Sequence, residues 1–168
     1  MPHLNKIVPC LWFDTQAEDA AKFYVAIFKD SRITRINYFS ETGHEIHGQP
    51  AGLAMTVAFE LSGQAFTALN GGPHFKFNEA VSLQVMCKTQ EEIDYYWEKL
   101  LAGGDKNAGQ CGWLKDRFGL SWQIVPEQIV ELFGDAGSDG YQRAMNAMLQ
   151  MKKLDINALQ RAYDGEAR

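Results

Sequence analysis

The chain has 168 residues, of which 46% are hydrophobic and 12% are aromatic. This is the length of one domain or of two small fused modules, and it supplies ample apolar side chains for a packed core. The net charge is −5, and no run of Lys or Arg provides the basic surface that binds nucleic acid or an anionic membrane. We therefore expect a globular protein with neither of these partners.

The N-terminal stretch MPHLNKIVPCLWFDTQ has no basic segment followed by a long apolar run, and nowhere do roughly 18 apolar residues follow one another. We therefore expect a cytoplasmic protein. The three cysteines, Cys10, Cys87 and Cys111, include no CxxC pair, which disfavours a disulfide framework or a zinc ribbon. We interpret them as buried core thiols rather than as nucleophiles.

Two segments form an internal repeat. TQAEDAAKFYVAIF at residues 15–28 and TQEEIDYYWEKLLAGG at residues 89–104 share Thr, Gln and Glu at matching positions. Each segment begins as a capping box, in which Thr15 or Thr89 accepts from a backbone N–H and the Glu three residues later returns a bond to the N–H of that Thr. The sequence therefore predicts a helix in each segment.

Each predicted helix follows an apolar, strand-like run and precedes further strand candidates. The predicted strands are KIVPCLWF, RITRINYFS, LAMTVAFEL and QAFTALN, and then AVSLQVMCK, CGWLKDR and LSWQIVP, with a poorly defined glycine-rich piece, GGDKNAGQ, after the second helix. The predicted order is βαβββ, twice. The fold class is thus α+β, with tandem βαβββ modules at residues 1–72 and 73–126 that form one structural domain.

Residues 127–168 are predicted to form a helical C-terminal extension. The stretch GDAGSDG breaks the chain, after which Tyr141, Ala144 and Met148 fall on one helical face. Asp155 is placed to cap a final short helix. We expect this methionine-rich face to pack on its own domain or across a dimer, with recognition of another partner as the weaker alternative.

Three stretches resemble a known family. FTALNGGPHFKFNEAVS, WLKDRFGLSWQIVPE and PCLWFDTQAEDAAKFY are similar to the PhnB-like family of the glyoxalase/bleomycin-resistance (vicinal oxygen chelate) superfamily, whose members also carry the label 3-demethylubiquinone-9 3-methyltransferase. The resemblance runs from about Lys6 to Tyr163. It implies a pair of βαβββ modules whose curled sheets enclose a pocket, and a homodimer.

The resemblance makes metal binding a specific question, because metal-dependent members of the superfamily carry His or Glu on the first and last strand of each module. The corresponding last-strand positions are Thr67 and Gln123, each four residues after a hairpin glycine. The first-strand positions fall at Val8 or Pro9 and at Ser82 or Leu83, a register that the sequence leaves open. Neutral hydroxyl and amide oxygens bind transition metals too weakly, so we predict no metal.

The four histidines are His3, the loop pair His44 and His47, and His74. The loop pair is the best alternative metal site, but no carboxylate or thiolate partner accompanies it. A class I methyltransferase is also disfavoured, because the first strand-to-helix turn, LWFDTQAEDAA, contains no glycine. We predict no bound cofactor.

A pocket with aromatic walls and uncharged hydrogen-bonding groups remains the expected site. The predicted ligand contacts are Trp12, Phe75, Phe77, Trp113, Thr67, Asn70, Ser82 and Gln123. Core packing is the alternative for each, and for Trp12 and Trp113 the sequence does not decide which face they occupy. We favour packing for Trp97 and for Trp122, which alternates with Gln123 along its strand.

The leading hypothesis is a metal-independent, PhnB-like protein that binds a small organic ligand and sequesters or senses a hydrophobic or aromatic compound. The alternative is an enzyme of unknown reaction on the same pocket, including the methyltransferase activity that the family label names. An enzyme is expected to carry a titratable group of shifted pKa in the pocket, such as Glu79, whereas a sequestering pocket can be neutral.

Overall fold

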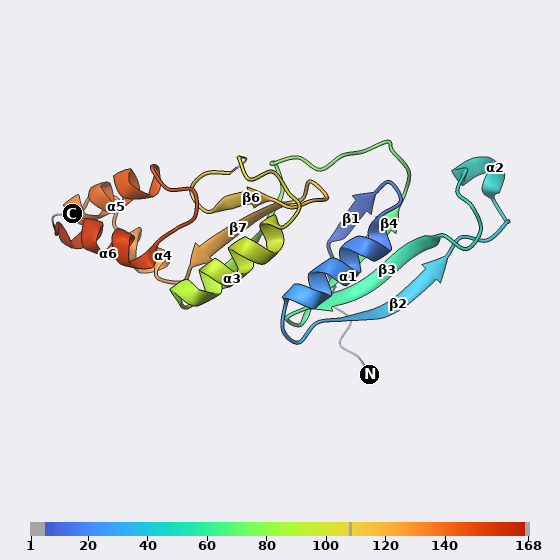
Figure 1. Cartoon of the computed structure of the whole chain (residues 1–168), viewed down its shortest axis with the longest axis horizontal. Helices are drawn as coiled ribbons and strands as arrows, with labels where there is room; N and C mark the ends of the chain where they lie inside the picture. The colour runs from blue at the N-terminus through green and yellow to red at the C-terminus, as the bar shows by residue number, and fades with distance from the viewer. Residues whose placement is uncertain (1–5, 108, 167–168) are drawn as a thin grey trace. The chain divides into compact units, whose positions relative to one another are not determined.

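The computed structural model describes residues 6–107 and 109–166. The chain divides after Phe77 into two compact units, each of which combines a β-sheet with helices (Figure 1). Among the described residues, no helix combines the length and the apolar character needed to cross a bilayer.

The first unit has the predicted βαβββ order, with one short extra helix. Its elements are β1 (Cys10–Phe13), α1 (Ala17–Ile27), β2 (Arg32–Tyr38), α2 (His44–His47), β3 (Ala54–Leu61) and β4 (Gln64–Asn70). The strands form one sheet in the order β1-β4-β3-β2, in which β1 runs parallel to β4 and the other neighbours are antiparallel.

Helix α1 packs against β3 and β4 on one face of this sheet (Figure 1). Its buried stripe is mostly small, with Tyr24 at the centre, where the ring stacks on Phe59 of β3 at a centroid distance of 6.3 Å. The sheet residues that alternate toward α1 are buried, namely Leu11, Phe13, Val57, Phe59, Leu61, Phe66 and Ala68. This alternation is the period of two that buries one face of a strand.

The start of α1 differs from the predicted capping box. The N-cap residue is Gln16, which makes no side-chain cap bond, so the prediction for Thr15 is wrong. The N–H of Ala17 instead donates to Oδ1 of Asn70 at 2.8 Å, and the Nδ2 of Asn70 donates to the carbonyl of Ala54 at 2.8 Å. A fully buried side chain from β4 therefore satisfies the backbone where α1 begins.

The second unit repeats the order with one strand fewer among the described residues. It comprises β5 (Ser82–Cys87), α3 (Gln90–Leu101), β6 (Trp113–Lys115) and β7 (Ser121–Pro126). The sheet order is β5-β7-β6, with β5 and β7 parallel. The glycine-rich piece after α3 forms no strand in the described residues, and its Gly103 and Gly109 adopt positive φ angles that a strand does not allow.

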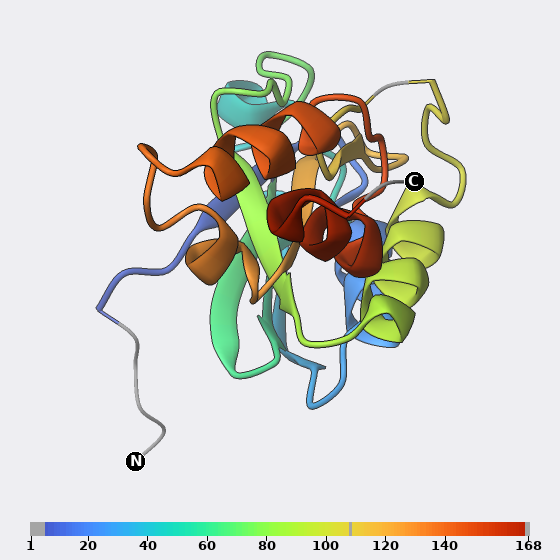
Figure 2. The same cartoon turned by 90° about the vertical axis from the view of Figure 1, so that its left-hand side faces the viewer.

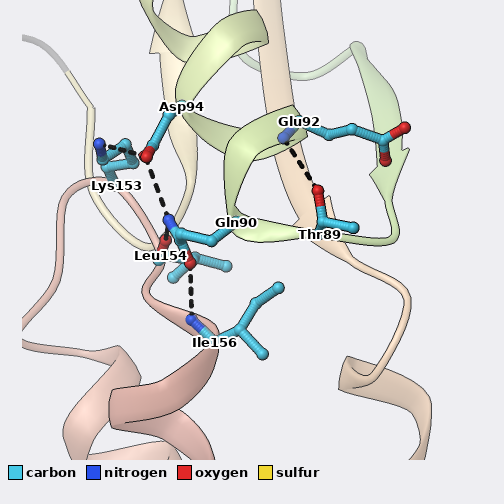
Figure 3. Close-up of polar contacts among 7 residues, drawn as sticks. All are labelled: Thr89, Gln90, Glu92, Asp94, Lys153, Leu154 and Ile156. Carbon is cyan, nitrogen blue, oxygen red and sulfur yellow. Dashed lines mark hydrogen bonds and ion pairs between the residues drawn. The ribbon is translucent and has the colours of Figure 1, made fainter.

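The capping box at Thr89 is confirmed, with one difference. The Thr89 hydroxyl accepts from the N–H of Glu92 at 3.3 Å, which starts α3 as predicted (Figure 3). The Glu92 carboxylate accepts from the N–H of Lys88 at 2.7 Å, one residue before the expected donor. Local sequence therefore fixes this helix start.

The turn between β6 and β7 is built around Asp116, which is buried although it is acidic. Its Oδ1 accepts from the N–H groups of Phe118 at 2.8 Å and Leu120 at 3.1 Å, and its Oδ2 accepts from the indole Nε1–H of Trp122 at 2.9 Å. One carboxylate thus links the turn to the strand that follows it.

The helical C-terminal extension contains α4 (Ile129–Leu132), α5 (Asp139–Met148) and α6 (Ile156–Asp164). Helices α5 and α6 lie side by side (Figure 2). Leu132, Leu154 and Leu159 form a small core with them. Asp155 caps α6, as predicted, by accepting from the N–H of Ala158 at 2.8 Å.

The Gln90 side chain fastens the extension to α3. Its Nε2 donates to the carbonyl of Leu154 at 3.1 Å, and its Oε1 accepts from the N–H of Ile156 at 2.9 Å (Figure 3). One turn further along α3, Asp94 forms an ion pair with Lys153. The extension therefore packs on its own unit.

The cysteines are free in this fold, but only Cys87 is a buried core thiol. Cys10 is exposed on β1, and Cys111 lies in a turn with φ of 56° rather than in a strand. The prediction of three buried thiols is therefore wrong for two of them. Burial, with a smaller contribution from Glu92 and Glu127, raises the pKa of Cys87 to about 12.

This raised pKa predicts a specific loss of stability in alkali. An unfolded chain ionises Cys87 from its ordinary pKa of 9.0, whereas the folded chain holds the proton until about pH 12, so the free energy of unfolding falls as pH rises between these values. By about pH 10.5 the native chain is expected to lose roughly 2 kcal/mol more than a Cys87→Ala variant. Urea titrations of both proteins at several pH values measure this difference, and parallel pH profiles would contradict it.

Candidate functional site

Each sheet has one face covered by its helix and one face turned away from it. The fully buried Asn70 points toward the start of α1, so its neighbours Thr67 and Leu69 on β4 belong to the opposite face. In the second sheet, Cys87 lies near Glu92 and Tyr96 of α3, so Cys87 belongs to the face that α3 covers. Ser82, Gln84 and Met86 therefore belong to the opposite face of β5. We call these two surfaces the α1-distal face and the α3-distal face.

Direct strand pairing defines the α1-distal face. Cys10 of β1 pairs with Thr67 of β4, and the next row pairs Trp12 with Leu69. These rows continue onto β3 and β2, where the Nδ2 of Asn37 donates to the hydroxyl of Thr56 at 3.0 Å. The surface therefore offers a thiol, hydroxyl groups and an amide beside an indole. Partial desolvation raises the pKa of the Cys10 thiol above its ordinary value, although the residue is exposed.

The indole of Trp12 is held from three sides. Its Nε1 donates to the carbonyl of Gly72 at 2.9 Å, and Phe75 packs edge-on against it at a centroid distance of 4.9 Å. At Gly71, an added Cβ would lie 2.1 Å from the indole, so only glycine allows this contact. Trp12 is thus fixed on the α1-distal face, and Phe75 beside it is 65% exposed.

Two predicted ligand contacts have structural roles instead. Asn70 is fully buried, and both ends of its amide bond to backbone groups, so we remove it from the candidate site. Phe77 packs edge-on against Phe13 at a centroid distance of 5.2 Å. Phe13 belongs to the helix-covered face, so Phe77 is a packing residue here as well.

The α3-distal face brings together three predicted residues. Gln123 of β7 pairs with Gln84 of β5 on one side and with Trp113 of β6 on the other. The Nε2 of Gln84 donates to Oε1 of Gln123 at 3.3 Å, and the Nε2 of Gln123 donates to the Ser82 hydroxyl at 2.8 Å. Gln123 is therefore the centre of a polar chain rather than an isolated core amide. Trp122 is buried on the opposite face, as its alternation with Gln123 predicted.

The strand pairing shows which first-strand residues lie beside Thr67 and Gln123. Thr67 lies opposite Cys10 and its N–H donates to the carbonyl of Pro9 at 2.9 Å, whereas Gln123 lies opposite Gln84 and donates to the Ser82 hydroxyl. Of the alternatives on β5, Ser82 shares the face of Gln123, and Leu83 belongs to the face toward α3. The first-strand positions at Val8 or Pro9 and at Ser82 or Leu83 stay predictions, because parallel pairing between distant strands sets this register and no local pattern encodes it.

The histidine pair does not form a metal site with acidic or thiol partners. In His47, Nδ1 accepts from the N–H of Gln49 at 3.0 Å and Nε2 lies 3.3 Å from the carbonyl of Thr42, so both ring nitrogens are already engaged. His3 lies outside the described residues. Within residues 6–107 and 109–166, no group of three or more His, Cys, Asp or Glu side chains gathers where it can hold a metal ion.

Glu79 carries a shifted pKa, but the direction is that of an ion pair. Lys115 donates to its carboxylate and lowers the pKa of Glu79 below its ordinary value. A general base that works near neutral pH needs a raised carboxyl pKa instead. Ser121 was not among the predicted ligand contacts, yet it pairs with Ser82 and with Lys115 on the α3-distal face. Ser121 and Gln123 lie on either side of Trp122 in the sequence, so the alternation of side chains along a strand places both of them on the same face.

Comparison with known proteins finds one family model and several similar structures. The family model described as 3-demethylubiquinone-9 3-methyltransferase matches residues 5–125. A Bacillus cereus structure titled putative 3-demethylubiquinone-9 3-methyltransferase, PhnB protein, is 33% identical with a TM-score of 0.63, and the match covers 73% of this chain and 99% of that one. A Pseudomonas aeruginosa protein is 20% identical with a TM-score of 0.57, over 74% of this chain and 98% of that one.

A third structure, from a Frankia species and titled a glyoxylase/bleomycin resistance protein/dioxygenase domain, is 14% identical with a TM-score of 0.47 and covers 73% of this chain and 92% of that one. A search of curated proteins found no match. The family model ends at residue 125, so it does not include the helical extension, whereas the sequence resemblance extends to about Tyr163.

Proposed function

Because the chain belongs to the 3-demethylubiquinone-9 3-methyltransferase family and is similar to the PhnB protein of Bacillus cereus, we propose that it binds a small organic compound without a metal. The observation that carries this proposal is the polar chain from Gln84 through Gln123 to Ser82, flanked by Trp113. Amide and hydroxyl groups next to an aromatic wall are typical of a site that orients an uncharged or weakly polar ligand. Sequestration or sensing of a hydrophobic or aromatic compound is the action that these side chains support.

The residues at the paired strand positions do not fit a transition metal. They are Cys10 with Thr67 in the first sheet and Gln84 with Gln123 in the second, so the four positions supply one thiol and no imidazole or carboxylate. Transition-metal sites in proteins draw three or four ligands from Cys, His, Asp and Glu. We therefore derive no metal-assisted step for this protein.

The residues do not fit S-adenosylmethionine in the manner of a class I methyltransferase either. That cofactor site needs a glycine-rich turn between the first strand and the first helix of a parallel, doubly wound sheet. Here residues 14–16 connect β1 to α1 without a glycine, and the sheet is mixed. An enzyme acting on the same faces stays the second candidate, because the family description names a methyl transfer.

A binding experiment separates these functions. We expect zinc, nickel, manganese and S-adenosylmethionine to leave the melting temperature unchanged, and a neutral aromatic amide such as 3-phenylpropionamide to raise it, since a ligand of the folded state stabilises that state. Gln123→Ala should abolish the rise, whereas the matched variant Gln142→Ala, on an exposed face of α5, should retain it.

Elemental analysis of the purified protein accompanies this titration. Stoichiometric metal would contradict the metal-free proposal, and a shift with S-adenosylmethionine alone would favour the enzyme. The homodimer implied by the family resemblance stays a prediction, which the molecular mass in solution tests.

A further inference from the structure

The α3-distal face changes in character along its strands. At one end, Met86 of β5 pairs with Val125 of β7, and Met86 is 45% exposed. The middle row contains the two glutamines and Trp113. At the other end, Ser121 lies between Ser82 and Lys115, where β5 and β7 begin. The face thus passes from apolar side chains, through an aromatic and amide row, to hydroxyl groups and an ammonium group.

Ser121 carries an unusual polar group at this last row. The residue is only 1% exposed, and its Oγ has no hydrogen-bond partner within the described part of the chain. A buried hydroxyl without a partner costs free energy, and native proteins rarely tolerate one. Its neighbours across the strands are the Ser82 hydroxyl, which already accepts from Gln123, and Lys115. A ligand that supplies an acceptor atom here would remove this cost.

Lys115 is the charged member of the row, and its ion pair is easily exchanged. The partner, Glu79, precedes β5 outside any helix or strand, and its side chain is 62% exposed. Exposed ion pairs contribute little to stability, so a competing anion in a better-shielded position can displace Glu79. Trp113 stands two residues before Lys115 on the same face, which separates the two side chains by about 7 Å along the strand. This is the spacing between an aromatic ring and a carboxylate in a short arylalkanoic acid.

We propose that the α3-distal face binds an aromatic carboxylate, with its ring against Trp113 and its carboxylate accepting from Ser121 and Lys115. This inference rests on the proposed function and names the ligand class and an additional binding residue, Ser121. The carboxylate takes the place of Glu79 at Lys115, and the apolar row at Met86 is left for any substituent on the far side of the ring.

The test compares 3-phenylpropionate with its neutral amide, 3-phenylpropionamide, in NMR titrations of the full chain. We expect the acid to bind about tenfold more tightly than the amide, because its charge-assisted bonds are stronger. Lys115→Met should remove this preference, so that the acid and the amide bind with similar affinity. Ser121→Ala should weaken acid binding about tenfold without lowering the melting temperature, because it deletes an unpartnered hydroxyl.

Glu79→Gln should tighten acid binding, since it removes the competitor for Lys115, and the exposed Lys152→Met is the matched control that should change nothing. Equal binding of acid and amide, or full retention of the preference in Lys115→Met, would overturn this inference and leave the proposed function standing. Binding of neither compound would overturn both.

Discussion

Replacing Asp116 with alanine is expected to lower the free energy of unfolding of the second unit by about 4 kcal/mol. The carboxylate is 3% exposed and accepts from two backbone N–H groups of its own turn and from the indole of Trp122. Hydrogen bonds to a charged acceptor contribute roughly 1.5–3 kcal/mol each, and their loss leaves buried donors without a partner. The alanine also leaves a gap next to Trp122.

Urea titration followed by circular dichroism measures this loss. The matched control is Asp105→Ala, because Asp105 also accepts from a backbone N–H two residues later, that of Asn107 at 2.9 Å, but is exposed. Asp105→Ala should lower the free energy of unfolding by less than about 1 kcal/mol. The loss of stability in Asp116→Asn should lie between those of the two alanine variants. The amide oxygen of Asn can still accept from the backbone N–H groups of the turn, but its NH2 group would face the indole N–H, and two donors do not form a hydrogen bond. An Asp116→Ala variant as stable as Asp105→Ala would show that the turn holds without its carboxylate.

Asp116→Ala is also expected to weaken ligand binding at the candidate site. Asp116 sets the turn from which β7 starts, and the first residues of β7 include Ser121 and Gln123. If the turn relaxes, the rows that place these two side chains beside Ser82 and Trp113 lose their alignment. Weakened ligand binding should therefore accompany the lost stability.

Those parts of the fold that depend on neighbouring residues could be predicted from the sequence. The Thr89 cap, the Asp155 cap and the opposite orientation of Trp122 and Gln123 are each encoded within a few residues. The alternation of side chains along a strand needs no knowledge of the strand's partner.

The features that could not be predicted depend on residues far apart in the chain. Thr15 has the same local pattern as Thr89, yet Asn70 from β4 takes over the start of α1. The places of Cys10 and Gln84 depend on which residue of a parallel neighbour lies opposite, and a shift by one residue exchanges the two faces. The absence of a hydrogen-bond partner for Ser121 among the described residues likewise has no local signal, because it follows from how the folded unit buries the hydroxyl.

The second large effect is expected at Asn70. Alanine at this position should lower the free energy of unfolding of the first unit by about 3 kcal/mol. The side chain is fully buried, and it joins the N–H of Ala17, where α1 starts, to the carbonyl of Ala54, where β3 starts. Its removal leaves both backbone groups buried without a partner and opens a small cavity between the helix and the sheet.

Asn37→Ala is the matched control in the same sheet. Asn37 is half-buried on β2, and its amide donates to the hydroxyl of Thr56. Its replacement therefore removes a hydrogen bond between two side chains and leaves the backbone at the start of α1 unaffected. We expect its cost to be about 1 kcal/mol. Hydrogen exchange adds a local measurement, because the N–H groups at the start of α1 should exchange much faster in Asn70→Ala and at an unchanged rate in Asn37→Ala.

The outcome also bears on Trp12. Asn70 ends β4, and the segment that follows it carries Gly71, Gly72 and Phe75 to the indole of Trp12. If Asn70 fixes this end of β4, its replacement should also alter Trp12 fluorescence, whereas a helix cap with no other role would leave the indole unchanged. Equal costs for Asn70→Ala and Asn37→Ala would mean that the helix-covered core, and not this amide, holds α1 against the sheet.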